Sequence, residues 1–292
     1  MSTFIRALAF AAVCACVARG AEPRIDGKSH FAAFGTNKVH YLTTGTGDKT
    51  VVFIHGWSGN ANVWNEQVSA LAKRAKLIFI DLPGHGQSDK PQAKYTMDYF
   101  ADGALAVLRD AKVQKTTLVG HSMGVAVICR MYAKAPELVV GLVAVDGLLK
   151  RPDLKPEQID QFTGPYRGPG YREHTVKFIH SMFPNPGTEA VRDRMVDEVL
   201  KTPQHVMASA MDQMFNSAEP NWDLKKVEVP VIAINAPNPR WTAEYEAYVK
   251  GLSSKSDYRV IEGVGHCLIV EKPERFNAAF VEFLSKHDLI GK

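Results

Sequence analysis

Residues 120–124 limit the possible folds of this chain more than any other segment. They read Gly-His-Ser-Met-Gly, and they lie between a β-rich run, Lys115–Val119, and an apolar stretch with helical spacing, Val125–Tyr132. A serine on a sharp strand-to-helix turn has a strained backbone, so side chains two residues before and after it would collide with the turn. Glycine at both positions removes those side chains. The pattern predicts that Ser122 is exposed at the N-terminus of a helix that follows a strand.

Two other apolar runs end in residues that could assist a serine. Val51–Ile54 is followed by residues 55–57, which read His-Gly-Trp, and Tyr258–Ile261 is followed by residues 263–266, which read Gly-Val-Gly-His. A serine hydroxyl is a poor nucleophile at neutral pH, so it needs a base, an orienting acid and donors for an oxyanion. These two segments contain candidates for the base and for the donors.

With a further motif at residues 81–89 (Asp-Leu-Pro-Gly-His-Gly-Gln-Ser-Asp), the chain resembles the α/β-hydrolase superfamily from about His30 to His287. The resemblance implies an α/β-hydrolase fold, which is a mostly parallel, doubly wound sheet with an inserted helical cap. It also implies acyl transfer to water from an ester, a thioester, a lactone or a related bond. Within that reaction, it makes Ser122 the nucleophile and His266 the general base.

The same resemblance assigns the oxyanion donors to the backbone. The N–H of Trp57 and the N–H of Met123, directly after the nucleophile, would hold the developing negative charge. His55 and Gly56 precede Trp57 in this loop, and we expect both to contact the substrate.

The orienting acid is missing from its usual place. In the superfamily an Asp usually follows the strand that corresponds to Pro230–Ile234, but Pro239 stands at that position here. Some members take the acid from the end of the preceding strand, and in this chain the run Gly141–Val145 ends at Asp146. Asp146 keeps the family order of serine, acid and histidine, although an Asp before Gly also forms ordinary turns. We favour Asp146, with Glu244 as second candidate and a Ser–His dyad as third.

Alternating strand and helix patterns favour a mostly parallel sheet. We expect a core in two parts, at residues 21–146 and 222–292, with a helical cap at 147–221 inserted between them. A signal peptide at residues 1–20 precedes the core. We expect the cap to cover the pocket and to select the substrate. The side chains assigned to the substrate pocket are Phe178, Met182, Met211, Phe215 and Trp241.

Composition argues against several other functions. The chain has 292 residues, of which 46% are hydrophobic and 23% charged, which is sufficient for one α/β domain with a substantial core. Its net charge of +4 comes from scattered Lys and Arg, so we expect no nucleic acid as partner. The resemblance implies a small-molecule ester as partner instead. The ten histidines contain no HExxH motif and the cysteines no zinc spacing. We therefore expect no metal and no other cofactor.

The first twenty residues have the features of an export signal. Arg6 precedes an apolar segment, Ala7–Ala18, that is too short to span a bilayer. Cleavage after Gly20 would make Ala21 the first mature residue. The predicted location is the periplasm or the outside of the cell, without stable membrane insertion after cleavage; a lipid anchor on Cys16 is less favoured.

Two cysteines would remain in the mature chain. Cys129 lies in the helix expected behind the nucleophile, and Cys267 directly follows His266. An oxidising compartment favours pairing, but the expected burial of Cys129 favours two free thiols over a disulfide.

The sequence favours a serine hydrolase that cleaves a carboxylic ester or lactone of a small to medium substrate through an acyl-enzyme on Ser122. A carbon–carbon bond hydrolase of the same fold remains open, because such enzymes also combine a serine with a cap. A small-molecule receptor without turnover is the alternative from a different class. The presence of nucleophile, base and oxyanion glycine together favours an enzyme.

Overall fold

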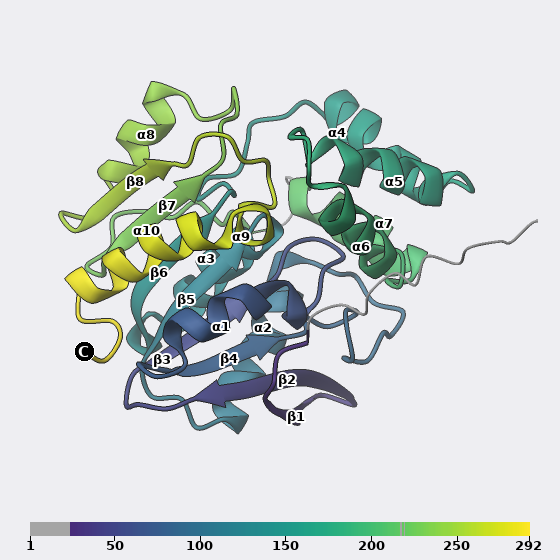
Figure 1. Ribbon diagram of the computed structural model, residues 1–292. Coiled ribbons are helices and arrows are strands. Elements are labelled where there is room, and N and C mark those ends of the chain that lie inside the picture. The colour runs from purple at the N-terminus through teal and green to yellow at the C-terminus, as the bar shows by residue number, and fades with distance from the viewer. Residues whose placement is uncertain (1–23, 217, 219) are drawn as a thin grey trace, which may run out of the picture.

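The computed structural model describes residues 24–216, 218 and 220–292. The predicted signal peptide, residues 1–20, lies outside the described residues. A central sheet runs through the molecule with helices on both faces, and a group of helices stands at one end (Figure 1). Among the described residues, no helix is long and apolar enough to cross a membrane.

The sheet contains eight strands in the order β1-β2-β4-β3-β5-β6-β7-β8. The hairpin of β1 and β2 forms one edge, β2 pairs antiparallel with β4, and the other neighbours pair in parallel. The mostly parallel α/β sheet predicted from the sequence is thus confirmed. The strands span Lys28–Phe34 (β1), Asn37–Gly45 (β2), Thr50–Ile54 (β3), Lys76–Ile80 (β4), Thr116–His121 (β5), Val139–Val145 (β6), Val231–Asn235 (β7) and Ser256–Val260 (β8).

The central strands carry continuous apolar runs because both of their faces are covered. In β3, Val52 and Ile54 pack into the core on one face, whereas Val51 and Phe53 pack into the core on the other. All four side chains are fully buried. Successive side chains of a strand point to opposite faces, so a continuous apolar run is typical of a strand between two layers of helices.

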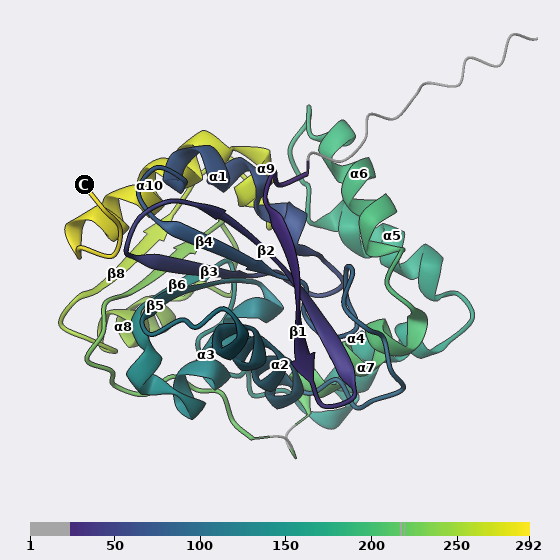
Figure 2. The same ribbon diagram turned by 90° about the horizontal axis from the view of Figure 1, so that it is seen from below.

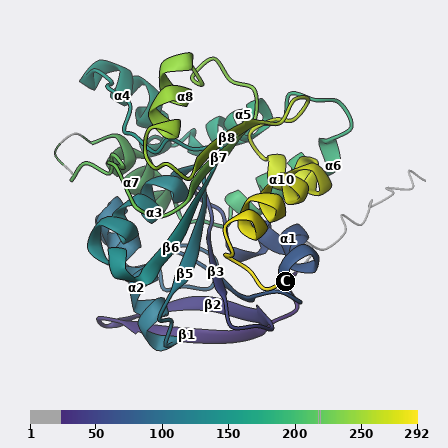
Figure 3. The ribbon, with the colours of Figure 1, turned by 90° about the vertical axis from the view of Figure 1, so that its left-hand side faces the viewer.

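The sheet separates the two layers of helices (Figures 2 and 3). Helices α1, α9 and α10 lie on one face, and α2, α3 and α8 lie on the other. The helices of the core span Asn65–Leu71 (α1), Met97–Asp110 (α2), Met123–Lys134 (α3), Ala243–Lys250 (α8), Leu268–Glu271 (α9) and Pro273–Lys286 (α10), with short 3-10 turns at Ala61–Trp64 (η1) and Pro136–Leu138 (η2).

Four further helices follow one another between β6 and β7, where the chain leaves the sheet and returns to it (Figure 1). They span Pro156–Thr163 (α4), Tyr171–Ser181 (α5), Glu189–Val199 (α6) and Gln204–Phe215 (α7), with a 3-10 turn at Gly164–Arg167 (η3). We call this group the cap helices. Together with the loops that follow β3, β5 and β6, they line a cavity. Open α/β sheets usually bind ligands beyond the carboxyl ends of their strands, and this cavity lies there.

Candidate active site

Ser122 occupies the turn between β5 and α3 with a backbone conformation that is rare for a residue with a side chain. Its φ is 55° and its ψ is −119°. A Cβ atom on Gly120 would lie 2.4 Å from the carbonyl oxygen of Gly124, and one on Gly124 would lie 2.5 Å from that of Ile54. Both distances are too short for any side chain. The collisions predicted from the Gly-x-Ser-x-Gly pattern are thus confirmed, and they explain how Ser122 reaches the cavity wall.

Asp146 and His266 form a hydrogen bond on the same cavity wall. The imidazole Nδ1 lies 2.5 Å from carboxylate Oδ2, and the side chains are 23% exposed for His266 and 3% exposed for Asp146. Because an ionised carboxylate can only accept, Nδ1 carries the proton and Nε2 keeps a lone pair. No described residue forms a hydrogen bond with Nε2, which leaves it available as a base.

The end of β7 holds Asp146 in place. The second carboxylate oxygen accepts from the backbone N–H of Ala236 at 2.7 Å, and the Asp146 N–H donates to the carbonyl of Ile234 at 2.9 Å. The strand after which the superfamily usually carries its acid therefore supplies one donor and one acceptor to an acid that comes from β6.

The alternative acid lies elsewhere. Glu244 is exposed on the first turn of α8, and a hydrogen bond from the Thr242 side chain lowers its pKa. It does not line the cavity. Of the two acids considered from the sequence, the fold brings Asp146 to His266 and leaves Glu244 on the surface.

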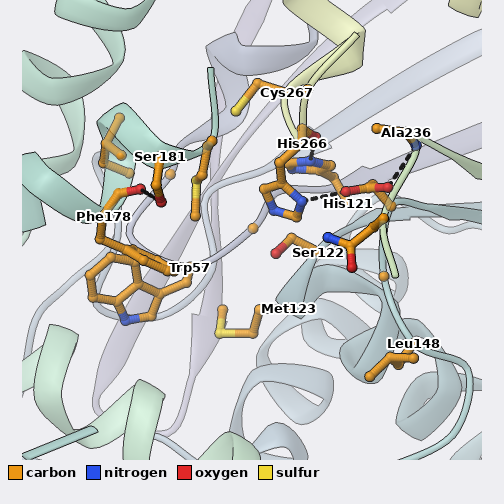
Figure 4. Close-up of a pocket in the computed structure, with 18 of the residues that line it drawn as sticks. Trp57, His121, Ser122, Met123, Leu148, Phe178, Ser181, Ala236, His266 and Cys267 are labelled. Atoms are coloured by element: carbon orange, nitrogen blue, oxygen red, sulfur yellow. Dashed lines mark hydrogen bonds and ion pairs between the residues drawn. The ribbon is translucent and has the colours of Figure 1, made fainter. Parts of the chain in front are cut away.

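The two predicted oxyanion donors belong to residues beside Ser122. Trp57 and Met123 both line the cavity, and a Cβ on Gly56 would lie 3.1 Å from the Cβ of Ser122. Among the described residues, neither the Trp57 N–H nor the Met123 N–H has a protein acceptor. Two free backbone donors next to a serine suit the oxygen of a tetrahedral intermediate. In Figure 4 the side chains of Trp57, Ser122 and Met123 surround one space.

His55 requires a correction. It is fully buried and it does not line the cavity, so the prediction that it contacts the substrate is wrong. The reason is the direction of the chain at the end of β3: Gly56 and Trp57 turn toward Ser122, while the imidazole of His55 points back into the protein. There it contacts the backbone of Gly56 and Leu82. Gly56, in contrast, does line the cavity.

His121 has a contact that the sequence did not reveal. Its Nε2 donates to the carbonyl oxygen of His266 at 2.9 Å, as drawn in Figure 4. Burial and the nearby imidazole of His266 lower the pKa of His121 to about 3, so this ring is neutral at physiological pH. It ties the loop that carries His266 to the turn that carries Ser122. Two residues 145 positions apart give no pattern from which such a bond could be predicted.

The cavity has a volume of about 300 Å³, and its walls are mostly apolar. The side chains predicted for the substrate pocket are all among its lining: Phe178, Met182, Met211, Phe215 and Trp241. Others were not predicted, including Phe162, Met195, Trp222 and Arg240. Phe162 and Met195 lie on cap helices that were expected, and their apolar side chains on those helices could have indicated that they line the cavity. Trp222 follows the cap in an irregular segment, where no periodicity exists to mark it.

The cap helices are hydrogen-bonded to both loops that flank Ser122. The indole N–H of Trp57 donates to the carbonyl of Met207 on α7 at 2.9 Å. The backbone N–H of His266 donates to the carbonyl of Met182, just after α5, at 3.1 Å. The cap therefore holds the positions of the Trp57 and His266 loops in addition to covering the cavity.

Cys129 and Cys267 are buried and unpaired, as expected for the described cysteines. Burial raises the pKa of both thiols, which keeps them protonated and poorly reactive. Within the described ranges, no group of three or more His, Cys, Asp or Glu residues could hold a metal ion.

Comparison with known proteins finds relatives in sequence and in fold. A family model described as alpha/beta hydrolase fold matches residues 49–168. An uncharacterised protein of Mycobacterium tuberculosis is 39% identical over 95 residues, which cover 32% of this chain and only 28% of that protein. The (E)-2-((N-methylformamido)methylene)succinate hydrolase of Acinetobacter baylyi is 25% identical over 258 residues, covering 84% of this chain and 94% of that protein.

Solved structures share the whole fold. An esterase from Thermogutta terrifontis superposes with a TM-score of 0.77 at 24% identity, covering 89% of this chain and 99% of the esterase. At this level of identity, the likeness establishes a common fold.

Proposed function

Because the chain is a member of the α/β-hydrolase superfamily by its fold and its family-model match, we propose that it is a serine hydrolase that cleaves a carboxylic ester or a lactone of a small to medium substrate. One observation carries the proposal. Ser122, held at positive φ, and the hydrogen-bonded pair of Asp146 and His266 line a single cavity. These are the groups that nucleophilic acyl transfer requires.

In the proposed reaction, Nε2 of His266 removes the proton of the Ser122 hydroxyl as its oxygen attacks the substrate carbonyl. The backbone N–H groups of Trp57 and Met123 hold the oxyanion. Asp146 fixes the imidazole tautomer and stabilises the imidazolium that forms. His266 then protonates the leaving alcohol, and the same base activates the water that releases the acid from Ser122.

The test is the hydrolysis of p-nitrophenyl esters from acetate to decanoate by the wild-type protein and by Ser122→Ala. We expect turnover that is lost in the variant, by a factor on the order of 10³ or more. Ser181→Ala is the matched control, because Ser181 also lines the cavity but donates to the carbonyl of Phe178. It should keep activity close to wild type. The chain-length profile would measure the acyl pocket.

Two results would contradict the proposal. One is ester turnover that survives in Ser122→Ala. The other is a folded wild-type protein that hydrolyses no ester or lactone and whose Ser122 does not react with a fluorophosphonate. If Ser122 reacts but no ester is hydrolysed, carbon–carbon bond hydrolysis becomes the leading alternative. If Ser122 does not react and no ester is hydrolysed, a binding protein without turnover becomes the leading alternative.

A second candidate is a hydrolase whose substrates carry a carboxylate. Arg240 lines the mostly apolar cavity, and within the described part of the chain no carboxylate pairs with its guanidinium. The relative from Acinetobacter baylyi is named for a succinate derivative. The same assay distinguishes the candidates: p-nitrophenyl hemisuccinate preferred over p-nitrophenyl butyrate, with the preference lost in Arg240→Gln, favours an acidic substrate.

A further inference from the structure

We infer that His55 is a positioning residue, which holds the Gly56–Trp57 peptide so that the N–H of Trp57 faces the cavity. The inference rests on the proposed function for its kinetic consequence. The orientation of this peptide group does not depend on the proposed function, because it is inferred from contacts around the end of β3.

The carbonyl of Gly56 and the N–H of Trp57 belong to the same peptide group. No peptide bond among the described residues is cis, and in a trans peptide the carbonyl and the N–H point in opposite directions. Whatever fixes the Gly56 carbonyl on the protein side therefore fixes the Trp57 N–H on the cavity side. A rotation of this one peptide plane would remove an oxyanion donor without moving any side chain that lines the cavity.

Two donors hold the Gly56 carbonyl. Nδ1–H of His55 donates to it at 2.7 Å, and the backbone N–H of Gly59 donates to it at 3.1 Å. The bond from His55 is the shorter of the two and comes from a ring that is fully buried. A side-chain donor is needed here because Gly56 has no side chain of its own to limit rotation. A Cβ at Gly56 would lie only 3.1 Å from the Cβ of Ser122 and 3.2 Å from Nδ1 of His121.

The other ring nitrogen of His55 sets the tautomer. Nε2 lies 3.0 Å from the backbone N of Leu82, and a backbone N–H can only donate. Nε2 must then accept, so the single proton of the neutral ring resides on Nδ1 and faces Gly56. Burial lowers the pKa of His55, in agreement with a neutral ring. The loop after β4 thus orients His55, and His55 in turn orients the loop after β3.

A matched pair of variants separates the two ring nitrogens. In His55→Asn, the side-chain amide can still donate from about the position of Nδ1, but the acceptor for Leu82 is lost. In His55→Gln, the side-chain oxygen can accept from Leu82 at about the position of Nε2, but the donor to Gly56 is lost. Both variants remove one buried hydrogen bond, so a merely structural role predicts similar losses.

Positioning predicts different losses. For the best ester, we expect kcat to fall about 10- to 100-fold in His55→Gln, less than the complete loss of an oxyanion donor, and to stay within about threefold of wild type in His55→Asn, with KM changed little in either. Crystal structures should show the Gly56–Trp57 peptide rotated in His55→Gln and retained in His55→Asn. Equal losses of kcat in both variants, or an unrotated peptide in His55→Gln, would overturn the inference.

A further test uses the wild-type protein alone, so its result does not depend on whether a variant folds. Nitrogen NMR of the imidazole should place the His55 proton on Nδ1 at pH 7, and a proton on Nε2 would also overturn the inference. If the wild type hydrolyses no ester, the proposed function fails, whereas the peptide orientation and the tautomer still decide the role of His55.

Discussion

At the scale of single residues, two of the proposed catalytic groups lie on strained backbone. Ser122 has φ 55° and Asp146 has φ 41°, and each such conformation costs on the order of 1–3 kcal/mol. The sheet stabilises both. The Ser122 N–H donates to the carbonyl of Val145, and the Asp146 N–H donates to that of Ile234, each at 2.9 Å. Both bonds continue the ladder to the next strand, so the strain persists because neighbouring strands impose the geometry.

The first prediction at this scale concerns the acid. Asp146→Asn should keep the hydrogen bond from the Ala236 N–H but lose the charge that fixes the tautomer of His266 and stabilises its imidazolium. We expect kcat on esters to fall by a factor on the order of 10³–10⁴, with little change in the urea midpoint. Glu244→Gln is the control, since that carboxylate is exposed. Comparable losses in both variants would contradict a specific role for Asp146, and near-wild-type turnover of Asp146→Asn would leave Ser122 and His266 as a dyad.

At the scale of secondary-structure elements, the strand-turn-helix unit of β5 and α3 depends on close backbone contact. The glycine at the start of α3, Gly124, lies against the carbonyl groups at the end of β3. This contact brings the N-terminus of α3, and with it the N–H of Met123, next to the loop of Gly56 and Trp57. A short sequence motif thus also sets the distance between a helix and a strand.

Gly124→Ala tests that contact. Its Cβ would lie 2.5 Å from the Ile54 oxygen and 2.8 Å from the His55 oxygen, so α3 must shift. We expect a loss of roughly 1–3 kcal/mol in the free energy of unfolding and a large loss of ester turnover. Gly170→Ala is the matched control, because a Cβ there meets nothing within 4 Å. Chemical denaturation of both variants measures the difference, and an equal effect of the two substitutions would contradict the argument.

At the scale of the whole molecule, buried histidines gather around the carboxyl ends of β3, β4 and β5. His55 follows β3, His85 follows β4 and His121 is the last residue of β5. Burial is the largest cause that lowers the pKa of each. The rings of His55 and His85 lie 5.0 Å apart, and those of His121 and His266 lie 4.8 Å apart. The segments that support the cavity therefore pack around three buried rings with lowered pKa values, His55, His85 and His121, and the fold is sensitive to their protonation.

Stability should consequently fall on mild acidification. The pKa of His85 and that of His121 are each about 3 in the folded protein, against about 6.5 in an unfolded chain. Below pH 6.5 the unfolded state binds protons that the folded state does not, so the free energy of unfolding decreases as the pH falls toward 3.

Urea unfolding at pH 7 and at pH 5 measures this effect. We expect a decrease of roughly 1–2 kcal/mol per buried histidine over that interval. In His85→Asn, which can still donate to the Pro83 carbonyl as Nδ1 of His85 does, the decrease should be smaller. His180→Asn on the exposed surface of α5 should leave it unchanged. A pH-independent free energy of unfolding in the wild type would contradict the lowered pKa values, because it would show that these rings bind protons equally in the folded and unfolded states.

Much of the molecule was predictable because its determinants are local. Residues 120–124 specify their own turn by steric exclusion, the apolar run of β3 specifies a buried strand, and the helical spacing of the cap specifies its helices. These determinants act between residues that are close in the sequence, so hydrophobic periodicity and the positions of glycine indicate them directly.

The tertiary structure decided what depends on distant segments. It brought Asp146, 120 positions away in the chain, to His266, and it left Glu244 on the surface. It turned His55 away from the cavity and toward the backbone of Leu82, and it joined His121 to the loop of His266. In each case the partner is selected by strand order and register, because a hydrogen bond between remote loops forms only where the sheet places their ends side by side.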